Sequence, residues 1–526
     1  MEERPPPAVV LSDAESRQPV PQLEQEHQSQ QIVPDETELR TGVAHTLPCT
    51  ASDDDNAPVC QLFHQLPSWN RVLWHISMQL QEVDAPGKLS LVRVSHDGIG
   101  WQQEQRSSDA RVLFHALLAS HRCVIRVDLS DAVFEGGTLN EIRELAVRAL
   151  RENKSLRILN INTLPDCNII RADILTVLAE MVGLQELSIG ESEDLRLVVD
   201  ALVSLILQST ALKTLDISEL VVGDTDSERL SASLKRNRSV TALSVHTSIL
   251  IARSGSGAAE FSQYLKRAPW IASLTVSACA ADASHEDLRG IIEPLLETRT
   301  ISELTLVGFQ LDGRCAGLLA QLVAHGVCLE RLNIGSCYWI RHRSSYDEKD
   351  ESSVLEAAKP HSSLLEALFL SKSVTVLHVG RFVFGEENLR FLAESVRNSN
   401  TLSEVYFLPL EDIDRHSFFR FLVPGIAGNY TLLRLHTSSP VEEETTEDQF
   451  IVRDVITRNR GLVTCAAHFV VYNVRTDHCT AAIERVQCSL GLVERVSDLA
   501  SVDKTEAVAM IQRSVLAGMR GQAGHQ

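Results

Sequence analysis

The feature that most constrains this chain is a short apolar motif that recurs along most of its length. The motif reads apolar-x-x-apolar-x-apolar, as in Leu212-x-x-Leu215-x-Ile217. Its copies begin at Val124, Leu156, Leu184, Leu212, Val240, Ile271, Ile301, Leu329, Val374, Leu402, Leu432 and, in the weakest form, Leu462. Five of the eleven intervals between these starts are 28 residues. A recurring period of this length indicates a solenoid of stacked repeats.

Each period has a pattern that predicts one strand and one helix. Alternation at the fourth and sixth positions predicts a short strand with one buried face. An amphipathic helix follows; in one repeat its apolar stripe is Leu389, Leu392, Ala393 and Val396. A single such unit leaves its apolar stripe exposed, so neighbouring units must stack to bury it.

The turn before each strand carries a resemblance to a known family. The segments 153–156 (Asn-Lys-Ser-Leu) and 237–240 (Asn-Arg-Ser-Val), together with the period of 28, resemble the ribonuclease-inhibitor class of leucine-rich repeats. They are similar to the repeat arms of NOD-like receptors. The resemblance implies an α/β solenoid, a curved horseshoe with parallel strands on the concave face, helices on the convex face and helical caps.

Two departures limit the resemblance. The family's ninth-position Asn or Cys is present at Cys279 and Cys337, but Phe309 and Phe382 stand there in other repeats. No G-x-x-x-x-G-K-[ST] motif occurs, so the sequence lacks the nucleotide-binding module of NOD-like receptors.

The domain boundaries follow from composition and from the extent of the repeats. Residues 1–57 are acidic and rich in Pro and Gln, which predicts a disordered tail. Residues 58–123 form an N-terminal cap with a degenerate first repeat at Leu89-x-x-Val92-x-Val94. The repeats occupy 124–462, with an insertion at about 338–362 that shows as a 45-residue interval. Residues 463–526 are expected to form a helical C-terminal cap.

Charge and cysteine usage restrict the partners and the compartment. The net charge of −21 disfavours nucleic acid and anionic membrane surfaces. Eleven cysteines without a C-x-x-C pair indicate reduced thiols, and neither a secretory signal nor a membrane-spanning stretch is visible. We therefore expect a soluble, cytoplasmic protein with a protein partner and no cofactor.

Several motifs are better explained by structure than by chemistry. The sequons at Asn153, Asn237 and Asn429 each fall in a polar turn of the repeat. A loose group at Cys465, His468, His478 and Cys479 matches no zinc module, so we predict no metal site. No nucleophile–base arrangement or metalloprotease motif can be argued from spacing, and we predict no catalytic residue and no enzyme.

The x positions of the motif predict the binding surface, because they line the concave face. Their charges are balanced, five bases against six acids, which suits a protein partner. Arginine and aromatic side chains make the strongest anchors of interfaces. The predicted protein-binding residues in the C-terminal half are Arg331, His378, Tyr406, Arg434 and His436.

Three functions are consistent with these features. The first is a protein-binding scaffold or regulatory adaptor, in signalling or innate-immune regulation. The second is an enzyme regulator, either a nuclease inhibitor or a GTPase-activating protein. The third is a substrate receptor of a ubiquitin ligase, for which residues 62–80 would have to act as an F-box-like segment.

Overall fold

The computed structural model describes residues 49–50, 59–82, 87–94, 104–250 apart from 193, 261–278 apart from 262 and 267, 285–339 apart from 327, 363–437 apart from 381–383 and 410–411, and 446–523. These residues belong to a unit that spans Ala44–Gln526. The predicted disordered tail at 1–57 lies outside the described residues except for Cys49 and Thr50. The predicted insertion at about 338–362 also lies outside them, except for Tyr338 and Trp339, which end a strand.

One sheet of 13 strands runs through this unit in the order of the sequence. All neighbouring strands pair in parallel except the first two, which are antiparallel. The strands are β1 Met78–Glu82, β2 Leu89–Arg93, β3 Val124–Leu129, β4 Ile158–Ile161, β5 Glu186–Ile189, β6 Thr214–Ile217, β7 Ala242–His246, β8 Ser273–Ser277, β9 Glu303–Leu311, β10 Arg331–Trp339, β11 Val376–Gly380, β12 Glu404–Leu408 and β13 Arg434–Thr437.

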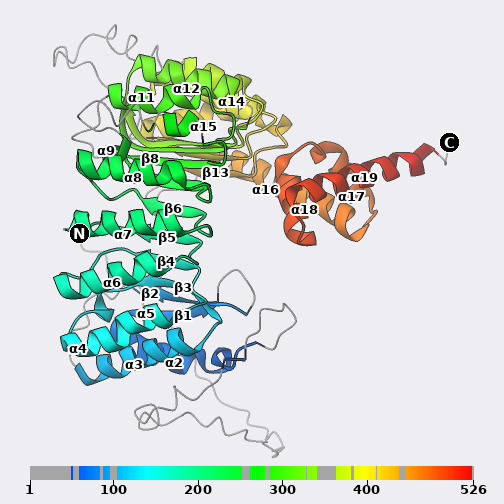
Figure 1. Cartoon of the computed structure of the whole chain (residues 1–526). Coiled ribbons are helices and arrows are strands. Elements are labelled where there is room, and N and C mark those ends of the chain that lie inside the picture. The colour runs from blue at the N-terminus through cyan, green and yellow to red at the C-terminus, as the bar shows by residue number, and fades with distance from the viewer. Residues whose placement is uncertain are drawn as a thin grey trace, which may run out of the picture. The chain divides into compact units, whose positions relative to one another are not determined.

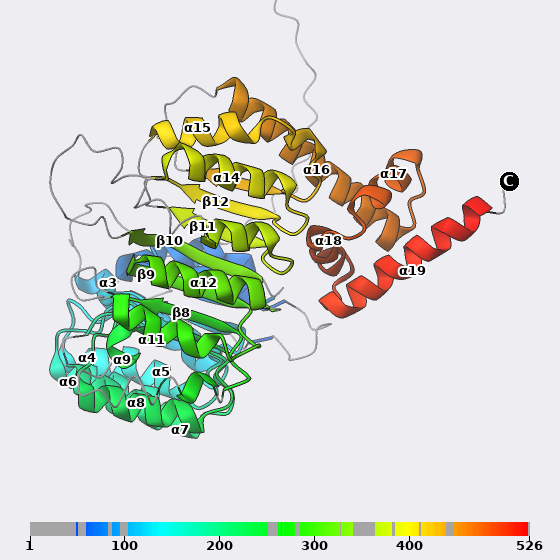
Figure 2. The same ribbon diagram turned by 90° about the horizontal axis from the view of Figure 1, so that it is seen from above.

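Helices alternate with the strands and cover one face of the sheet (Figures 1 and 2). The repeat helices and short helical turns are η4 Asp131–Val133, α4 Leu139–Ile142, η5 Arg143–Val147, α5 Arg148–Glu152, α6 Asn168–Glu180, α7 Leu195–Gln208, α8 Asp224–Arg236, α9 Thr247–Leu250, α11 His285–Leu295, α12 Gly313–His325, α14 Gly385–Asn398, α15 Asp412–Leu422 and η6 Ile426–Gly428. This alternation confirms the predicted leucine-rich-repeat solenoid, with strands on the inner face and helices on the outer face.

The core is a stack of aliphatic layers contributed by the motif. In the repeat that contains β6, Leu212, Leu215 and Ile217 are all fully buried. In the repeat that contains β11, the helical stripe of α14, from Leu389 to Val396, is also buried. Each such side chain contributes roughly 1.5–3 kcal/mol on burial, so the layers together hold the array. An unpaired charge in one layer would therefore disrupt two repeats at once.

The polar turns form a hydrogen-bonded ladder beside these layers. The side-chain oxygen of Asn153 accepts hydrogen bonds from the backbone N–H groups of Ser155 and Leu156, at 2.9 and 2.6 Å. Its amide nitrogen donates to the carbonyl of Leu118 in the preceding repeat, at 2.7 Å. Asn237 and Asn429 repeat this arrangement and are likewise buried. The structure thus gives all three sequons a packing role, as the sequence predicted.

The N-terminal cap closes the first end of the sheet. It consists of η2 Gln61–Gln65, α2 Leu66–Leu73, η3 Trp74–Ile76, the hairpin β1–β2 and α3 Glu104–Ser120. The degenerate strand predicted at Leu89 is β2, which pairs with β3. The antiparallel strand β1 was not predicted. The side chain of Asn70 in α2 exchanges two hydrogen bonds with the backbone of Leu80, so part of the backbone of this edge strand is covered.

The C-terminal cap is helical, but it begins earlier than the expected residue 463. Its helices are α16 Glu447–Tyr472, α17 Asp477–Val486, α18 Leu490–Ala500 and α19 Lys504–Ala523. The helix α16 starts with a capping box between Thr446 and Gln449. Leu462 lies inside this helix, so the weak twelfth repeat expected there is wrong. The buried amide of Asn459 donates to the carbonyls of Asn429 and Leu432, and it thereby extends the polar ladder onto the cap.

No helix in the described part of the chain combines the length and the apolar character that a membrane span requires.

Candidate functional site

Two rows of outward side chains cross the C-terminal half of the concave face. Both rows follow the strand register from β9 to β13. The charged row consists of Glu303, Arg331, Val376, Glu404 and Arg434. The ring row, two residues further along each strand, consists of Thr305, Asn333, His378, Tyr406 and His436. Because neighbouring parallel strands lie about 4.8 Å apart, each row forms a continuous line of side chains.

The ring row contains a stack of three aromatic side chains. The rings of His378 and Tyr406 are 3.8 Å apart between centroids, with an interplanar angle of 14°. Those of Tyr406 and His436 are 4.4 Å apart, with an angle of 10°. His378 and Tyr406 are half-buried, whereas His436 is exposed. The stack holds Tyr406 in one orientation, so little side-chain entropy remains for a partner to remove.

The charged row is made of ion pairs between adjacent strands. Arg331 Nε lies 3.3 Å from a carboxylate oxygen of Glu303, and Arg434 Nη1 lies 3.0 Å from one of Glu404. The hydroxyl of Tyr406 also reaches Glu404 at 3.5 Å, which links the two rows. Both arginine side chains remain about half exposed. They therefore keep donors available for a partner's carboxylates or carbonyls.

Backbone and apolar groups extend this surface beyond the rings. Leu408, two residues after Tyr406, is an exposed large hydrophobic residue at the end of β12. Gly380 lies opposite it on β11, and a Cβ atom there would come within 2.7 Å of the Leu408 carbonyl oxygen. Only a glycine permits this close approach without a shift of the backbone. The surface is thus shaped by backbone as well as by side chains.

The environment of His378 favours its neutral form. Burial lowers the pKa of His378, and the nearby His436 and Arg331 lower it further, while Glu404 acts in the opposite direction. A neutral imidazole can donate one hydrogen bond and accept another. The ring row therefore offers mixed donors and acceptors around an aromatic centre.

The five predicted binding residues lie together as the sequence placed them. Arg331, His378, Tyr406, Arg434 and His436 occupy four successive strands, β10 to β13. The stacking of the three rings could not be predicted from the sequence. The ion pairs of Arg331 with Glu303 and of Arg434 with Glu404 were not predicted either. The repeat spacing of 28 to 45 residues indicates that equivalent positions of adjacent strands lie side by side. The orientation of each ring, however, depends on the rotamer of its side chain. Their role in binding stays a prediction.

A separate cavity of about 800 Å³ lies at the edge where strands β10 to β12 begin. It is open to solvent and is lined by turn residues such as Lys372 and Thr401 and by residues of α18 and α19, including Val493, Ile511 and Leu516. Its lining combines an apolar wall with a few polar groups. The cavity borders the charged row through Glu330, which precedes Arg331.

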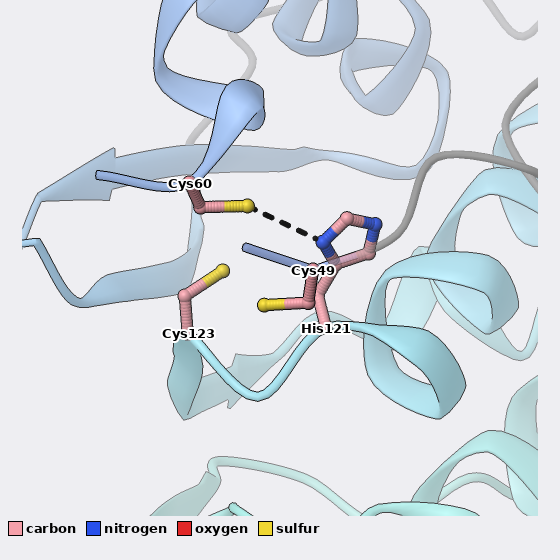
Figure 3. A group of neighbouring side chains, drawn as sticks. All are labelled: Cys49, Cys60, His121 and Cys123. Atoms are coloured by element: carbon pink, nitrogen blue, oxygen red, sulfur yellow. Dashed lines mark hydrogen bonds between the residues drawn. The ribbon is translucent and has the colours of Figure 1, made fainter. Parts of the chain in front are cut away.

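Two groups of cysteine and histidine residues lie in the two caps. In the C-terminal cap, Cys465 and Cys479 lie in the apolar core of the helices and His478 is exposed, so the four residues noted from the sequence do not converge on one point. In the N-terminal cap, the ligand atoms of Cys49, Cys60, His121 and Cys123 all lie within 4.8 Å of one another (Figure 3). Sequence analysis missed this group, although the His121-x-Cys123 spacing was a signal.

The similarities of this chain to known proteins are to solved structures. No protein-family model matches the chain, and no curated protein matches it. Among solved structures, the leucine-rich repeat-containing protein LegL7 from Legionella pneumophila is similar over 60% of this chain and 94% of that chain. The identity is 14% and the TM-score is 0.35. The leucine-rich-repeat architecture is therefore assigned from the strand order and register of this chain itself.

Proposed function

We propose that this chain is a non-enzymatic scaffold or regulatory adaptor that binds another protein on the C-terminal half of its concave face. The observation that carries the proposal is the ordered stack of His378, Tyr406 and His436 beside two half-exposed arginines. Aromatic and arginine side chains dominate the binding energy of protein interfaces, particularly when they are already fixed in place. Balanced charges on the same face suit a mixed polar and apolar partner surface.

We also propose a class of leucine-rich repeat and a cellular compartment for this chain. The polar turns and the 28-residue period support the ribonuclease-inhibitor class of repeats, similar to a NOD-like-receptor arm without its nucleotide-binding module. Signalling or innate-immune regulation would follow from that similarity. The free cysteines of the described residues fit a reducing, cytoplasmic environment.

The alternatives predict different partners. A nuclease inhibitor would retain a nuclease, and a GTPase-activating protein would retain a small GTPase. A ubiquitin-ligase receptor would retain a ligase scaffold through residues 62–80, and these residues form η2, α2, η3 and part of β1 within the N-terminal cap. None of the three has a specific observation in its favour here.

The experiment compares three immobilised full-length chains in extract from native cells. They are the wild type, Tyr406→Ala, and Arg390→Ala on the convex helix α14, where Arg390 is exposed. We expect a partner that is retained by the wild type and by Arg390→Ala but depleted by Tyr406→Ala. A partner retained equally by all three would show that binding uses another surface. Turnover of a nucleotide or other substrate by the purified chain would refute the non-enzymatic part.

A further inference from the structure

The group in the N-terminal cap unites four side chains from three separate segments of the chain. Cys49 precedes the cap, Cys60 immediately precedes η2, and His121 and Cys123 lie in the turn between α3 and β3. Cys60, His121 and Cys123 are buried, and Cys49 is half-buried. Figure 3 shows the three sulfur atoms and one imidazole nitrogen directed toward a common point. Cys60 and Cys123 are free thiols.

The distances suit a tetrahedral metal ion. Zinc binds thiolate sulfur at about 2.3 Å and imidazole nitrogen at about 2.0 Å, so neighbouring ligand atoms lie about 3.5 to 3.8 Å apart. Cys60 Sγ lies 3.5 Å from His121 Nδ1, and every pair of the four ligand atoms is within 4.8 Å. Three cysteines and one histidine form a ligand set that structural zinc sites use.

Comparison with the three asparagine turns shows that His121 and Cys123 stand at the positions of the polar ladder. In those turns the asparagine stands three residues before the first motif position, and a serine or threonine stands one residue before the same position. Asn153 and Ser155, for example, hold these positions before Leu156. Before Val124, the same two positions are His121 and Cys123. The turn before β3 thus has two metal-ligating groups where those three turns have hydrogen-bonding side chains.

The backbone holds this first turn in place without help from the two side chains. The N–H of Val124 donates to the carbonyl of His121 at 3.3 Å, and the N–H of His121 donates to Leu117 in α3 at 3.1 Å. The N–H of Leu89, at the start of β2, donates to the carbonyl of Cys123 at 2.8 Å. His121 and Cys123 are therefore presented by a fixed frame, as a preorganised site requires.

A metal ion at this point would set the protonation of the group, because zinc binds thiolate sulfur and neutral imidazole nitrogen. A divalent ion would stabilise the thiolates, and its binding would release their protons to solvent.

We propose that Cys49, Cys60, His121 and Cys123 bind one zinc ion, which fastens the N-terminal cap to the first repeat. This site is independent of the concave face and of the proposed partner. It joins three segments of the chain that lie between positions 49 and 123, next to the start of β3. The role is structural, because all four ligand positions are filled by protein.

The first test uses the reduced full-length chain after removal of metal with a chelator. Titration with zinc should give about one bound ion per chain and a rise in the melting temperature, since a ligand that binds only the folded state stabilises it. Titration with Co²⁺ should give the intense visible bands of a tetrahedral thiolate site. Failure to take up zinc, with an unchanged melting temperature, would overturn the proposal. So would a disulfide between Cys49 and Cys60 in protein purified without reductant.

The second test assigns the ligands. We expect Cys60→Ser and Cys123→Ser to lose the bound zinc, and Cys167→Ser, an exposed cysteine outside the group, to retain it. Undiminished zinc content in a Cys60→Ser/Cys123→Ser double variant would place the metal elsewhere and refute the site. If the serine variants do not fold, the Co²⁺ spectrum of the wild type decides, because it reports thiolate ligation without any substitution.

Discussion

The concave face has two halves that share one backbone geometry but present different side chains. Toward the N-terminus, the positions that continue the ring row hold small polar groups. They are Asp128, Asn160, Ser188, Asp216, Ser244 and Thr275. Toward the C-terminus, the same row holds Asn333, His378, Tyr406 and His436. The positions of this row pair without a register shift in both halves, although β9 and β10 shift register beyond Asn333. At these positions the two halves therefore differ in side-chain chemistry.

Several of these small polar groups already have hydrogen-bond partners within the chain. Asn160 donates to the carboxylate of Asp128, and Ser218 donates to Asp216 at 2.7 Å. A partner docking there would have to desolvate these groups for little apolar contact. The stacked rings instead offer apolar area with polar edges, already fixed in orientation. In the function that we propose, the repeat architecture supplies a surface, while a few side chains decide where the partner binds.

The largest effect is expected from a change in the layer that lies between the two halves. Leu304 in β9 is fully buried, so Leu304→Asp places an unpaired charge in the core. We expect a loss of at least about 4 kcal/mol in the free energy of unfolding, measured by denaturant titration. The conservative Leu304→Met should cost less than about 1.5 kcal/mol. Equal protease resistance of Leu304→Asp and the wild type would contradict the assigned register.

The next largest effect is expected on partner affinity, which should depend on the C-terminal half of the concave face and not on the N-terminal half. Once a partner is identified, Tyr406→Ala should weaken binding by about 2 kcal/mol, or roughly 30-fold in Kd, because it removes the centre of the ring stack. Thr275→Ala, at the matching row position in the other half, should change binding by less than about 0.5 kcal/mol. Calorimetry on both variants would check this. Similar losses of binding free energy in Tyr406→Ala and Thr275→Ala would show that the two halves of the concave face do not differ in binding.

A smaller effect is expected from the charged row. Arg434 and Glu404 are 3.0 Å apart, but the arginine side chain is half exposed, so solvent screens the pair. A double-mutant cycle with Arg434→Ala and Glu404→Ala should give a coupling energy below about 1 kcal/mol for folding, and added salt should reduce it. The cycle for Arg331 and Glu303 provides the control. A coupling of several kcal/mol would mean that this row holds the fold together.

The smallest effect is a pH dependence that arises from the ring row. Because the pKa of His378 in the folded chain lies below its ordinary value of 6.5, the unfolded chain binds more protons as pH falls below that value. The contribution of His378 to stability is therefore complete above pH 6.5 and declines as pH falls toward the folded pKa. Melting temperatures of the wild type and of His378→Gln should be measured across this pH range. Plotted against pH, those of the wild type should fall more steeply as the pH is lowered. Parallel plots of melting temperature against pH would show that burial does not lower the pKa of the His378 imidazole.

Much of the repeat array could be predicted from the sequence, because each strand repeats one local pattern. The apolar positions from Val124 to Leu432 all precede or enter strands, and the asparagine turns have the packing role expected for them. At Leu462 the apolar spacing led to a wrong prediction of a repeat. Three apolar positions with suitable spacing also occur on an amphipathic helix, and the capping box at Thr446 starts that helix well before the apparent motif.

The sites were predicted to different extents for a physical reason. The row positions align because strands stack in register, so Arg331 and Tyr406 could be placed on one face from spacing alone. The cysteine and histidine group depends on how the cap folds back onto the first turn. Nothing in the local sequence of Cys49 or Cys60 specifies that tertiary contact, so the group becomes visible only in three dimensions.

The central claim is that a partner binds the rings of the C-terminal half, and hydrogen exchange of the complex tests it most directly. Backbone amides in the peptides that contain β11, β12 and β13 should exchange more slowly when the partner is bound, while peptides from the convex helices α6 to α8 and from strands β4 to β6 should be unchanged. Protection restricted to the convex helices, with none at β11 to β13, would contradict the account.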